Sequence, residues 1–153
     1  MPTPARASSR PDIPVLEDYA HRVDRDIRFF DLDGVGHVNH AAVARFFEEG
    51  RLMYLADIND PITADPVFML AHIAIDYLAQ LHWPGIVTVG TRIARFGRSS
   101  VHWDQAVFHR GVCTARARSV MVLADRTREA SVPIPDDLRV QLAERGAGPR
   151  PPS

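Results

Sequence analysis

The chain has 153 residues, of which 46% are hydrophobic and 24% are charged, and its formal net charge is -1. This length suits one domain with its own core, and the composition is that of a globular protein and not of a disordered one. No run of about 18 apolar residues is present, so a transmembrane helix is excluded. All 18 basic residues are arginines scattered along the chain, so no nucleic-acid-binding stripe is indicated.

Both ends of the chain differ in composition from its middle. Residues 1–18 and 146–153 are rich in Pro, Ser or Gly, and we expect a disordered leader and a disordered tail. The leader lacks the apolar run of a secretory signal. A single domain is therefore expected over residues 19–145. The only cysteine, Cys113, excludes an intrachain disulfide and fits a reducing, cytoplasmic setting.

The first half of this domain changes from a strand pattern to a helix pattern. Residues 19–30 alternate imperfectly in hydrophobicity, which predicts a strand, and the glycines in DLDGVGHVNH (31–40) predict a turn. Apolar residues then recur every three or four positions, which predicts a helix that ends near Asn59. Asn39 directly precedes this pattern and is the expected N-cap. The expected apolar face consists of Ala42, Val43, Phe46, Phe47, Gly50, Met53 and Tyr54.

The second half reads as strands followed by a short helix. Alternation around Ile73 and Ile75 is followed by strand-like runs at 86–96, 100–110 and 112–125, and short turns separate these runs. Short links favour antiparallel neighbours, so we expect four strands in a meander. Residues 133–146 predict a terminal helix that ends at Gly146. Because a helix with one apolar face has to be covered by a sheet, the order predicts an α+β architecture.

The loop before the long helix contains a candidate hydrolytic group. Asp33 is ionised at neutral pH, and a carboxylate beside a thioester can attack its carbonyl carbon or deprotonate a water. The first N–H groups of the helix, at Asn39 or His40, could hold the oxyanion, and such a donor contributes about 3–4 kcal/mol. The glycines Gly34 and Gly36 would let a substrate approach the backbone. From spacing alone, a plain connection between a strand and a helix is the better interpretation.

The residues around this loop also match a known family. The stretch from Arg28 to Arg51, RFFDLDGVGHVNHAAVARFFEEGR, closely resembles the opening of hotdog-fold acyl-CoA thioesterases of the 4-hydroxybenzoyl-CoA thioesterase type, and it is similar to that of acyl-ACP thioesterases. The likeness covers about residues 20–142 and implies a hotdog fold, an antiparallel sheet wrapped around one long helix. The matching motif positions are Asp33, His37, Val38, Asn39, Glu48, Glu49 and Arg51.

The resemblance implies roles for individual residues. Asp33 becomes the catalytic carboxylate, as nucleophile or general base, and the backbone N–H near His40 becomes the oxyanion donor. The substrate is an acyl-CoA or acyl-carrier-protein thioester, with no cofactor other than coenzyme A as part of the substrate. A homodimer or homotetramer is implied, with coenzyme A bound across the interface. The acyl group is expected along the helix. The other implied substrate contacts are Gly36 in the loop, Val43 and Phe47 on the helix, and Arg95, Gly97, Arg98, Ser99 and Ser100 for the pantetheine and phosphates.

Two positions depart from the family motif. His40 stands where the family has a second Asn, and Val43 stands where an aromatic residue is usual, so these changes concern acyl specificity more than the reaction. His37 could act as a general acid or substrate donor, or it could simply hold the loop. No HExxH or cysteine-based spacing is present, and no metal site is predicted.

Other assignments stay open at this point. Glu48 or Glu49 could serve as a helix-borne base, but salt pairs of Arg45 with Glu49 and of Glu48 with Arg51 are the plainer interpretation. Two other functions compete with a thioesterase: a hotdog acyl-CoA dehydratase or hydratase, and a non-catalytic acyl-thioester binding protein. A binding protein would keep its affinity for the acyl thioester if Asp33 lost its charge.

Overall fold

The computed structural model describes residues 12–56 and 65–146. Most of the predicted leader and tail, and the predicted helix end at Asn59, lie outside the described residues. The strands are β1 (His21–Ile27), β2 (Val67–Tyr77), β3 (Gly85–Phe96), β4 (Ser100–His109), β5 (Val112–Asp125) and β6 (Ala130–Ser131). The helices are α1 (His40–Ala56) and α2 (Asp136–Gly146), and two short 3-10 turns are η1 (Leu16–Asp18) and η2 (Phe29–Asp31).

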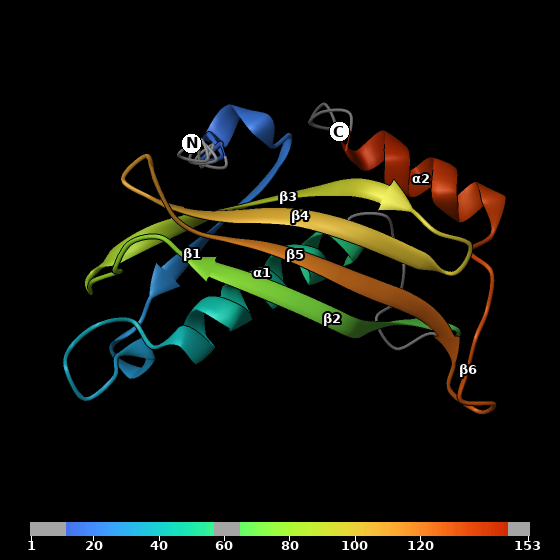
Figure 1. Cartoon of the computed structure of the whole chain (residues 1–153), viewed down its shortest axis with the longest axis horizontal. Coiled ribbons are helices and arrows are strands. Elements are labelled where there is room, and N and C mark those ends of the chain that lie inside the picture. The colour runs from blue at the N-terminus through green and yellow to red at the C-terminus, as the bar shows by residue number, and fades with distance from the viewer. Residues whose placement is uncertain (1–11, 57–64, 147–153) are drawn as a thin grey trace, which may run out of the picture.

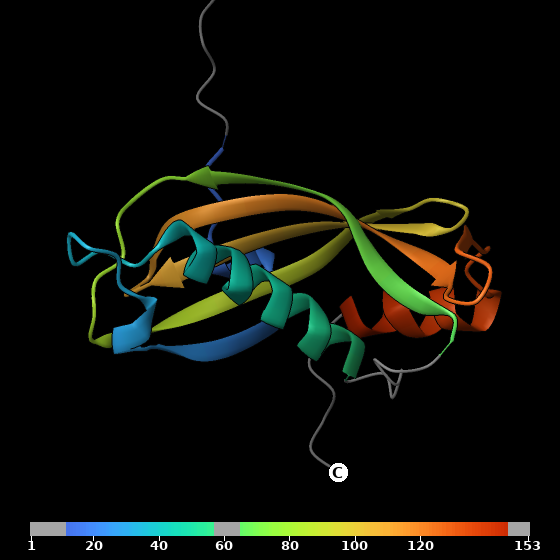
Figure 2. The same cartoon turned by 90° about the horizontal axis from the view of Figure 1, so that it is seen from below.

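One antiparallel sheet curls around the long helix. Its strand order is β1-β3-β4-β5-β2, with the short β6 paired to β5. Figures 1 and 2 show α1 lying in the hollow of the sheet, with α2 at the end away from the start of α1. The predicted α+β hotdog arrangement is confirmed.

The predicted meander is only partly correct. β3, β4 and β5 are consecutive neighbours, but β2 pairs with β5 at the far edge of the sheet and not with β3. The link between β2 and β3, residues 78–84, is short, which favoured pairing of these two strands. Seven extended residues reach roughly 23 Å, whereas three strand spacings need only about 14 Å. The link is therefore long enough to cross the end of the sheet.

The first strand is shorter than the pattern predicts. β1 ends at Ile27, and Phe29 and Phe30 lie in η2 with their side chains exposed. Residues 12–18, which we assigned to the leader, include η1, where Leu16 packs beside the buried Tyr19. The domain boundaries stay a prediction.

The start of α1 follows the sequence prediction closely. The side-chain oxygen of Asn39 accepts the N–H of Ala41 at 2.8 Å, which is the expected N-cap. The expected apolar face is buried except for Met53, which is 38% exposed. Arg51, which was not expected on this face, is buried instead of Met53, at 3% exposure.

Arg51 belongs to a polar layer that divides the core. Its Nη1 donates to Gln105 Oε1 at 2.8 Å and, at 3.5 Å, to Ser119 Oγ. Gln105 in turn donates to the carbonyl oxygen of Phe47 and to Thr91 Oγ1. Burial lowers the pKa of the Arg51 guanidinium. An apolar cluster lies on each side of this layer, one around the first half of α1 and one beneath α2.

Candidate active site

Asp33 is held by its own loop. Its Oδ1 accepts the N–H groups of Val35, at 2.9 Å, and of His37, at 3.0 Å. Its backbone N–H donates to the carbonyl oxygen of His37 at 2.8 Å, and its own carbonyl oxygen accepts the N–H of Gly36. Gly36 has a φ of 83°, a conformation that favours glycine. The loop is therefore closed around the carboxylate, which is fixed in orientation.

Two groups suited to thioester hydrolysis remain unoccupied. Among the described residues, neither the second oxygen of Asp33 nor the backbone N–H of His40 has a hydrogen-bond partner. The next N–H groups of α1 are taken, since Asn39 accepts those of Ala41, Ala42 and Val43. A carboxylate oxygen and a free N–H at a helix N-terminus are thus carried by one rigid loop.

The pKa of Asp33 is lowered from its ordinary value of 3.8. The main causes are the N–H groups of Val35 and then His37, which stabilise the ionised form by hydrogen bonding. The carboxylate is therefore ionised throughout the neutral range.

Asp31 has a supporting role. It is 2% exposed, its Oδ2 accepts the N–H of Arg28 at 2.7 Å, and its Oδ1 pairs with Arg45 of α1 at 2.7 Å. Its carbonyl oxygen accepts the N–H of Asn39 at 2.7 Å. Both carboxylate oxygens of Asp31 are therefore engaged, whereas the hydrogen bonds of the Asp33 side chain use Oδ1 alone.

The two histidines of the motif differ in their surroundings. The ring of His37 lies edge-on to that of His82, with centroids 5.1 Å apart, while its backbone N–H and carbonyl groups hold the loop. The ring of His40 is exposed, and its carbonyl oxygen accepts the hydroxyl of Tyr77 at 3.3 Å.

The carboxylates in the middle of α1 point elsewhere. Glu49 pairs with Arg45 at 3.4 Å, as predicted, and also with Arg25 at 2.7 Å. Glu48 is exposed, and the predicted pair of Glu48 with Arg51 is wrong, because Arg51 turns into the core towards Gln105.

A cavity of about 280 Å³ lies beside the N-terminus of α1. His37 and His40 lie at its edge, and Val43, one turn further along the helix, forms part of its wall. Phe47, which we also expected at the substrate, is completely buried and is not among the lining residues. The remaining wall comes from Val38 and from two other parts of the chain, namely residues 77–81 and Thr114 with Ala115.

Residues 77–81 lie within the family likeness, but no contact with the substrate was expected there. They run from the last residue of β2 across the end of the sheet, where the carbonyl oxygen of Leu81 accepts the N–H of Val38 at 2.9 Å. Leu78 and Ala79 both donate to the carbonyl oxygen of Thr114. Their residue types indicate no chemistry, and the crossing of the β2–β3 link brings them to the helix.

The structure does not bring the expected coenzyme A contacts to Asp33. Arg95, Gly97, Arg98, Ser99 and Ser100 form the β3–β4 turn and its flanks. β3 begins beside Ile27, near the Asp33 loop, and runs for 12 residues in the opposite direction. At about 3.3 Å per residue, the turn is therefore roughly 35 Å from the loop within one chain.

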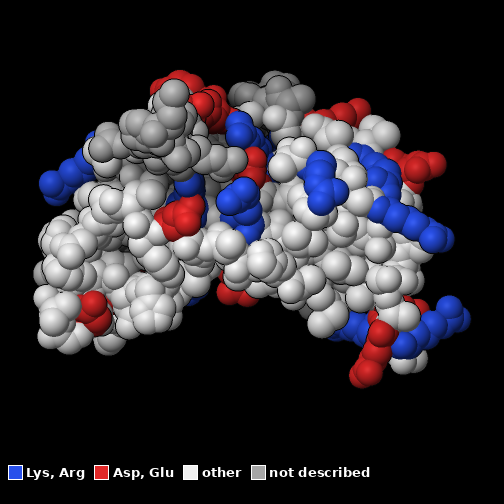
Figure 3. Space-filling view, viewed as in Figure 1, with Lys and Arg blue, Asp and Glu red and all other residues white. Residues whose placement is uncertain are grey.

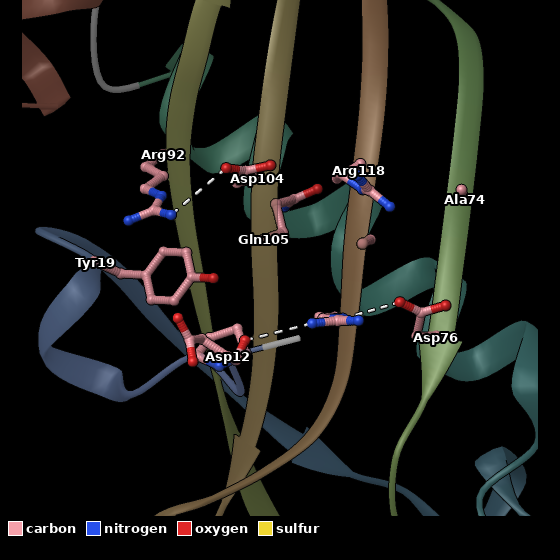
Figure 4. Close-up of a pocket in the computed structure, with 11 residues that line it drawn as sticks. Asp12, Tyr19, Ala74, Asp76, Arg92, Asp104, Gln105 and Arg118 are labelled. Atoms are coloured by element: carbon pink, nitrogen blue, oxygen red, sulfur yellow. Dashed lines mark hydrogen bonds and ion pairs between the residues drawn. The ribbon is translucent and has the colours of Figure 1, made fainter. Parts of the chain in front are cut away.

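A second cavity, of about 250 Å³, lies on the outer face of the sheet. Figure 4 shows Arg92 paired with Asp104, at 3.5 Å. Arg116 pairs with Asp76 at 2.8 Å. It shares no lining residue with the cavity beside α1. We therefore place the candidate active site at the Asp33 loop and the cavity beside it.

The surface near this site is unusually apolar. The side chains of Phe29, Phe30, Val35, Trp83 and Ile86 are all exposed, Phe30 to 92%. Figure 3 shows that this end, at lower left, carries few charged groups, whereas both positive and negative groups lie over the rest of that face. That face therefore shows no continuous basic surface of the kind that binds nucleic acid.

Two features are absent from the described part of the chain. It contains no helix long and apolar enough to cross a membrane. Residues 12–56 and 65–146 also contain no group of three or more His, Cys, Asp or Glu side chains arranged to hold a metal ion.

The chain resembles known proteins over most of its length. A family model described as the thioesterase-like superfamily matches residues 27–142. A Pseudomonas aeruginosa PAO1 protein of known structure is 30% identical, with a TM-score of 0.79 over 89% of this chain and 99% of that chain. A Thermus thermophilus thioesterase, solved with coenzyme A and Zn, is 30% identical, with a TM-score of 0.80 over 88% of this chain and 100% of that chain. A predicted thioesterase from Bacillus stearothermophilus is 31% identical, with a TM-score of 0.75 over 84% of this chain and 98% of that chain. No curated protein matches.

Proposed function

Because the chain belongs to the thioesterase-like superfamily, we propose that it hydrolyses an acyl-CoA to the free acid and coenzyme A, with Asp33 as the catalytic carboxylate. The observation that carries this proposal is the free oxygen of Asp33 on the same rigid loop as the free N–H of His40. The Thermus thermophilus relative, which was solved with coenzyme A, supports the choice of thiol.

The proposed reaction uses these two groups in sequence. The free oxygen of Asp33 attacks the thioester carbon, or it removes a proton from a water that attacks. The carbonyl oxygen becomes an oxyanion, which the N–H of His40 holds at the positive end of the α1 dipole. The C–S bond then breaks and the thiolate leaves; in the first route, water hydrolyses the resulting acyl-aspartyl anhydride and restores the carboxylate.

The test is free-thiol release from short, medium, long and aromatic acyl-CoAs. Steady release that follows the enzyme concentration supports the proposal. Consumption of an enoyl-CoA double bond without thiol release would favour a hydratase instead. Binding without either reaction would favour an acyl-thioester binding protein.

The pKa of Asp33 leads to a prediction about pH. Because hydrogen bonds lower this pKa below 3.8, the active ionised form is lost only as the pH falls below that value. We expect kcat/KM for thiol release to stay level from about pH 8 down to about pH 5, measured in buffers of constant ionic strength. If half of the activity is already lost at a pH above about 5, another group supplies the base.

We further propose that the active form is at least a homodimer paired through β2. This strand is at the sheet edge, and large apolar side chains on it are exposed, namely Met69, Leu70 and Tyr77. A long edge strand with exposed apolar side chains is a template for pairing with a strand of another chain. Antiparallel pairing of two β2 strands would bring the β3–β4 turn of one copy towards the Asp33 loop of the other.

This arrangement predicts a role for Arg98 in coenzyme A binding. Its side chain is exposed, and a contact between its guanidinium and a phosphate would be charge-assisted. We expect Arg98→Ala to raise KM for acyl-CoA about tenfold, with little change for the matching acyl-pantetheine, which has no nucleotide phosphates. Arg126→Ala, which removes another exposed arginine, is the matched control. Equal KM values for Arg98→Ala and wild type would remove the turn from the proposed site.

A further inference from the structure

The cavity beside α1 has a closed inner end. Val38, Val43, Leu81 and Ala115 are apolar and at least nine-tenths buried, and they all belong to one packed cluster. Three polar lining residues, His37, His40 and Gln80, are partly or fully exposed, whereas Thr114 is buried with its hydroxyl bonded to the carbonyl oxygen of Val107. An acyl group that enters between the polar residues would therefore place its apolar end against Val43 and Ala115.

Beyond Val43, two successive layers of side chains fill the space between α1 and β5. The first consists of Phe47 and Ala117, and the second of Arg51 and Ser119. Inward-facing residues of β5 alternate, so Ala115 is followed by Ala117 and then by Ser119. Phe47, one helical turn after Val43, belongs with Ala117 to the same packed cluster. The next turn carries Arg51, which binds Ser119 in the polar layer. Ala117 is small, so Phe47 supplies most of the bulk in its layer.

These two layers set a limit on acyl length. A longer chain would have to displace Phe47, and it would then meet the buried guanidinium of Arg51 without offering it a hydrogen bond. Burying a charged group against hydrocarbon is unfavourable, because the charge loses polar contacts. The space available to the acyl group is therefore limited to the cavity itself.

We infer that the acyl group is short, or a single aromatic ring, and that Val43 and Phe47 determine this limit. The inference rests on the proposed function, because it takes the cavity as the acyl site of a thioesterase. A cavity of about 280 Å³ is just below the range of roughly 300–1,000 Å³ that is usual for small-molecule sites, which suits a short acyl chain or a benzoyl group.

The test is a binding measurement that needs no hydrolysis. S-alkyl-CoA thioethers from ethyl to hexadecyl, and S-benzyl-CoA, are titrated calorimetrically into the full chain. For the wild type we expect affinity to rise up to hexyl or octyl and to fall at least tenfold by dodecyl. Val43→Phe should weaken binding of the hexyl and benzyl compounds at least tenfold while changing ethyl binding little.

Phe47 and its neighbour Phe46 offer a matched pair of variants. Both are buried phenylalanines of the same cluster, but Phe46 faces the β1 side of α1, where it lies under Arg45. Phe47→Ala should move the optimum length upwards by at least two carbons, and Phe46→Ala should leave it unchanged. Phe47→Leu and Phe46→Leu replace this pair if either alanine variant fails to fold by circular dichroism.

The possible outcomes separate the inference from the proposed function. Affinity that rises steadily to hexadecyl, no binding at any length, or the same optimum in Phe47→Ala and Phe46→Ala would each overturn the length limit. A peak at hexyl that shifts with Phe47 supports the limit, even if thiol release from acyl-CoAs is absent. In that case only the proposed hydrolysis fails.

Discussion

Replacing Asp33 by asparagine is expected to reduce kcat for thiol release about a thousandfold and to leave the fold intact. The amide oxygen of asparagine can still accept the N–H groups of Val35 and His37, which hold the loop in the wild type. What the variant loses is the negative charge and with it the group that attacks the thioester or activates water. The measurement is single-turnover thiol release, with thermal unfolding followed by circular dichroism alongside.

The matched control for this variant is Glu48→Gln. It also neutralises one carboxylate, but on an exposed position of α1, and we expect a change in kcat of less than twofold. If Asp33→Asn keeps wild-type activity while Glu48→Gln or Glu49→Gln loses it, the base is on the helix and the proposed role of Asp33 is wrong.

Replacing Asp31 by alanine should act on stability. The change leaves the N–H of Arg28 without its acceptor and Arg45 without its closest carboxylate at a position that is 2% exposed. Removing one partner of a buried pair typically costs about 3–5 kcal/mol, and because Arg45 is partly exposed we expect about 3 kcal/mol less free energy of unfolding. Urea unfolding followed by fluorescence measures this directly.

Asp26→Ala provides the comparison for Asp31→Ala, since Asp26 is an exposed carboxylate on the neighbouring β1. A loss of stability below about 0.5 kcal/mol is expected for this exposed site. If both variants lose the same free energy, the link between Asp31 and Arg45 does not stabilise the loop, and the account of Asp31 as its anchor is wrong.

The elements that the sequence predicted well depend on local rules. The N-cap at Asn39, the apolar face of α1 and the turn at Gly36 each involve residues within a few positions of one another. The strand order was harder, because a link of seven residues can join neighbours or cross the sheet, and the sequence does not distinguish the two. Arg51 was misplaced for a similar reason: only its distant partners, Gln105 and Ser119, make its burial favourable.

In the candidate site, too, residues that are close in sequence were predicted, and residues that come from distant parts of the chain were not. Asp33, His37 and His40 were proposed because they lie in one continuous motif, and the structure places them in one loop and at the first residue of α1. Leu81 and Thr114 carry no signal of chemistry, and they reach the cavity only through the sheet topology. The turn at Arg98 matched the family pattern, but it is far from Asp33 within one chain, and its proposed role requires the proposed dimer.

The position of β2 at the far edge also has a consequence for folding. β3, β4 and β5 are joined by tight turns and can pair soon after each hairpin closes, whereas β2 has to wait for β5, which comes much later in the chain: Tyr77 pairs with Ala115 and Val67 with Ala124. Contacts between distant parts of a chain form slowly, because loop closure costs entropy before pairing compensates for it. The residues that complete the cavity directly follow β2. Pulse-labelling hydrogen exchange should therefore show the hairpins protected first and the cavity wall last, so that competence to bind substrate appears only at the final step of folding.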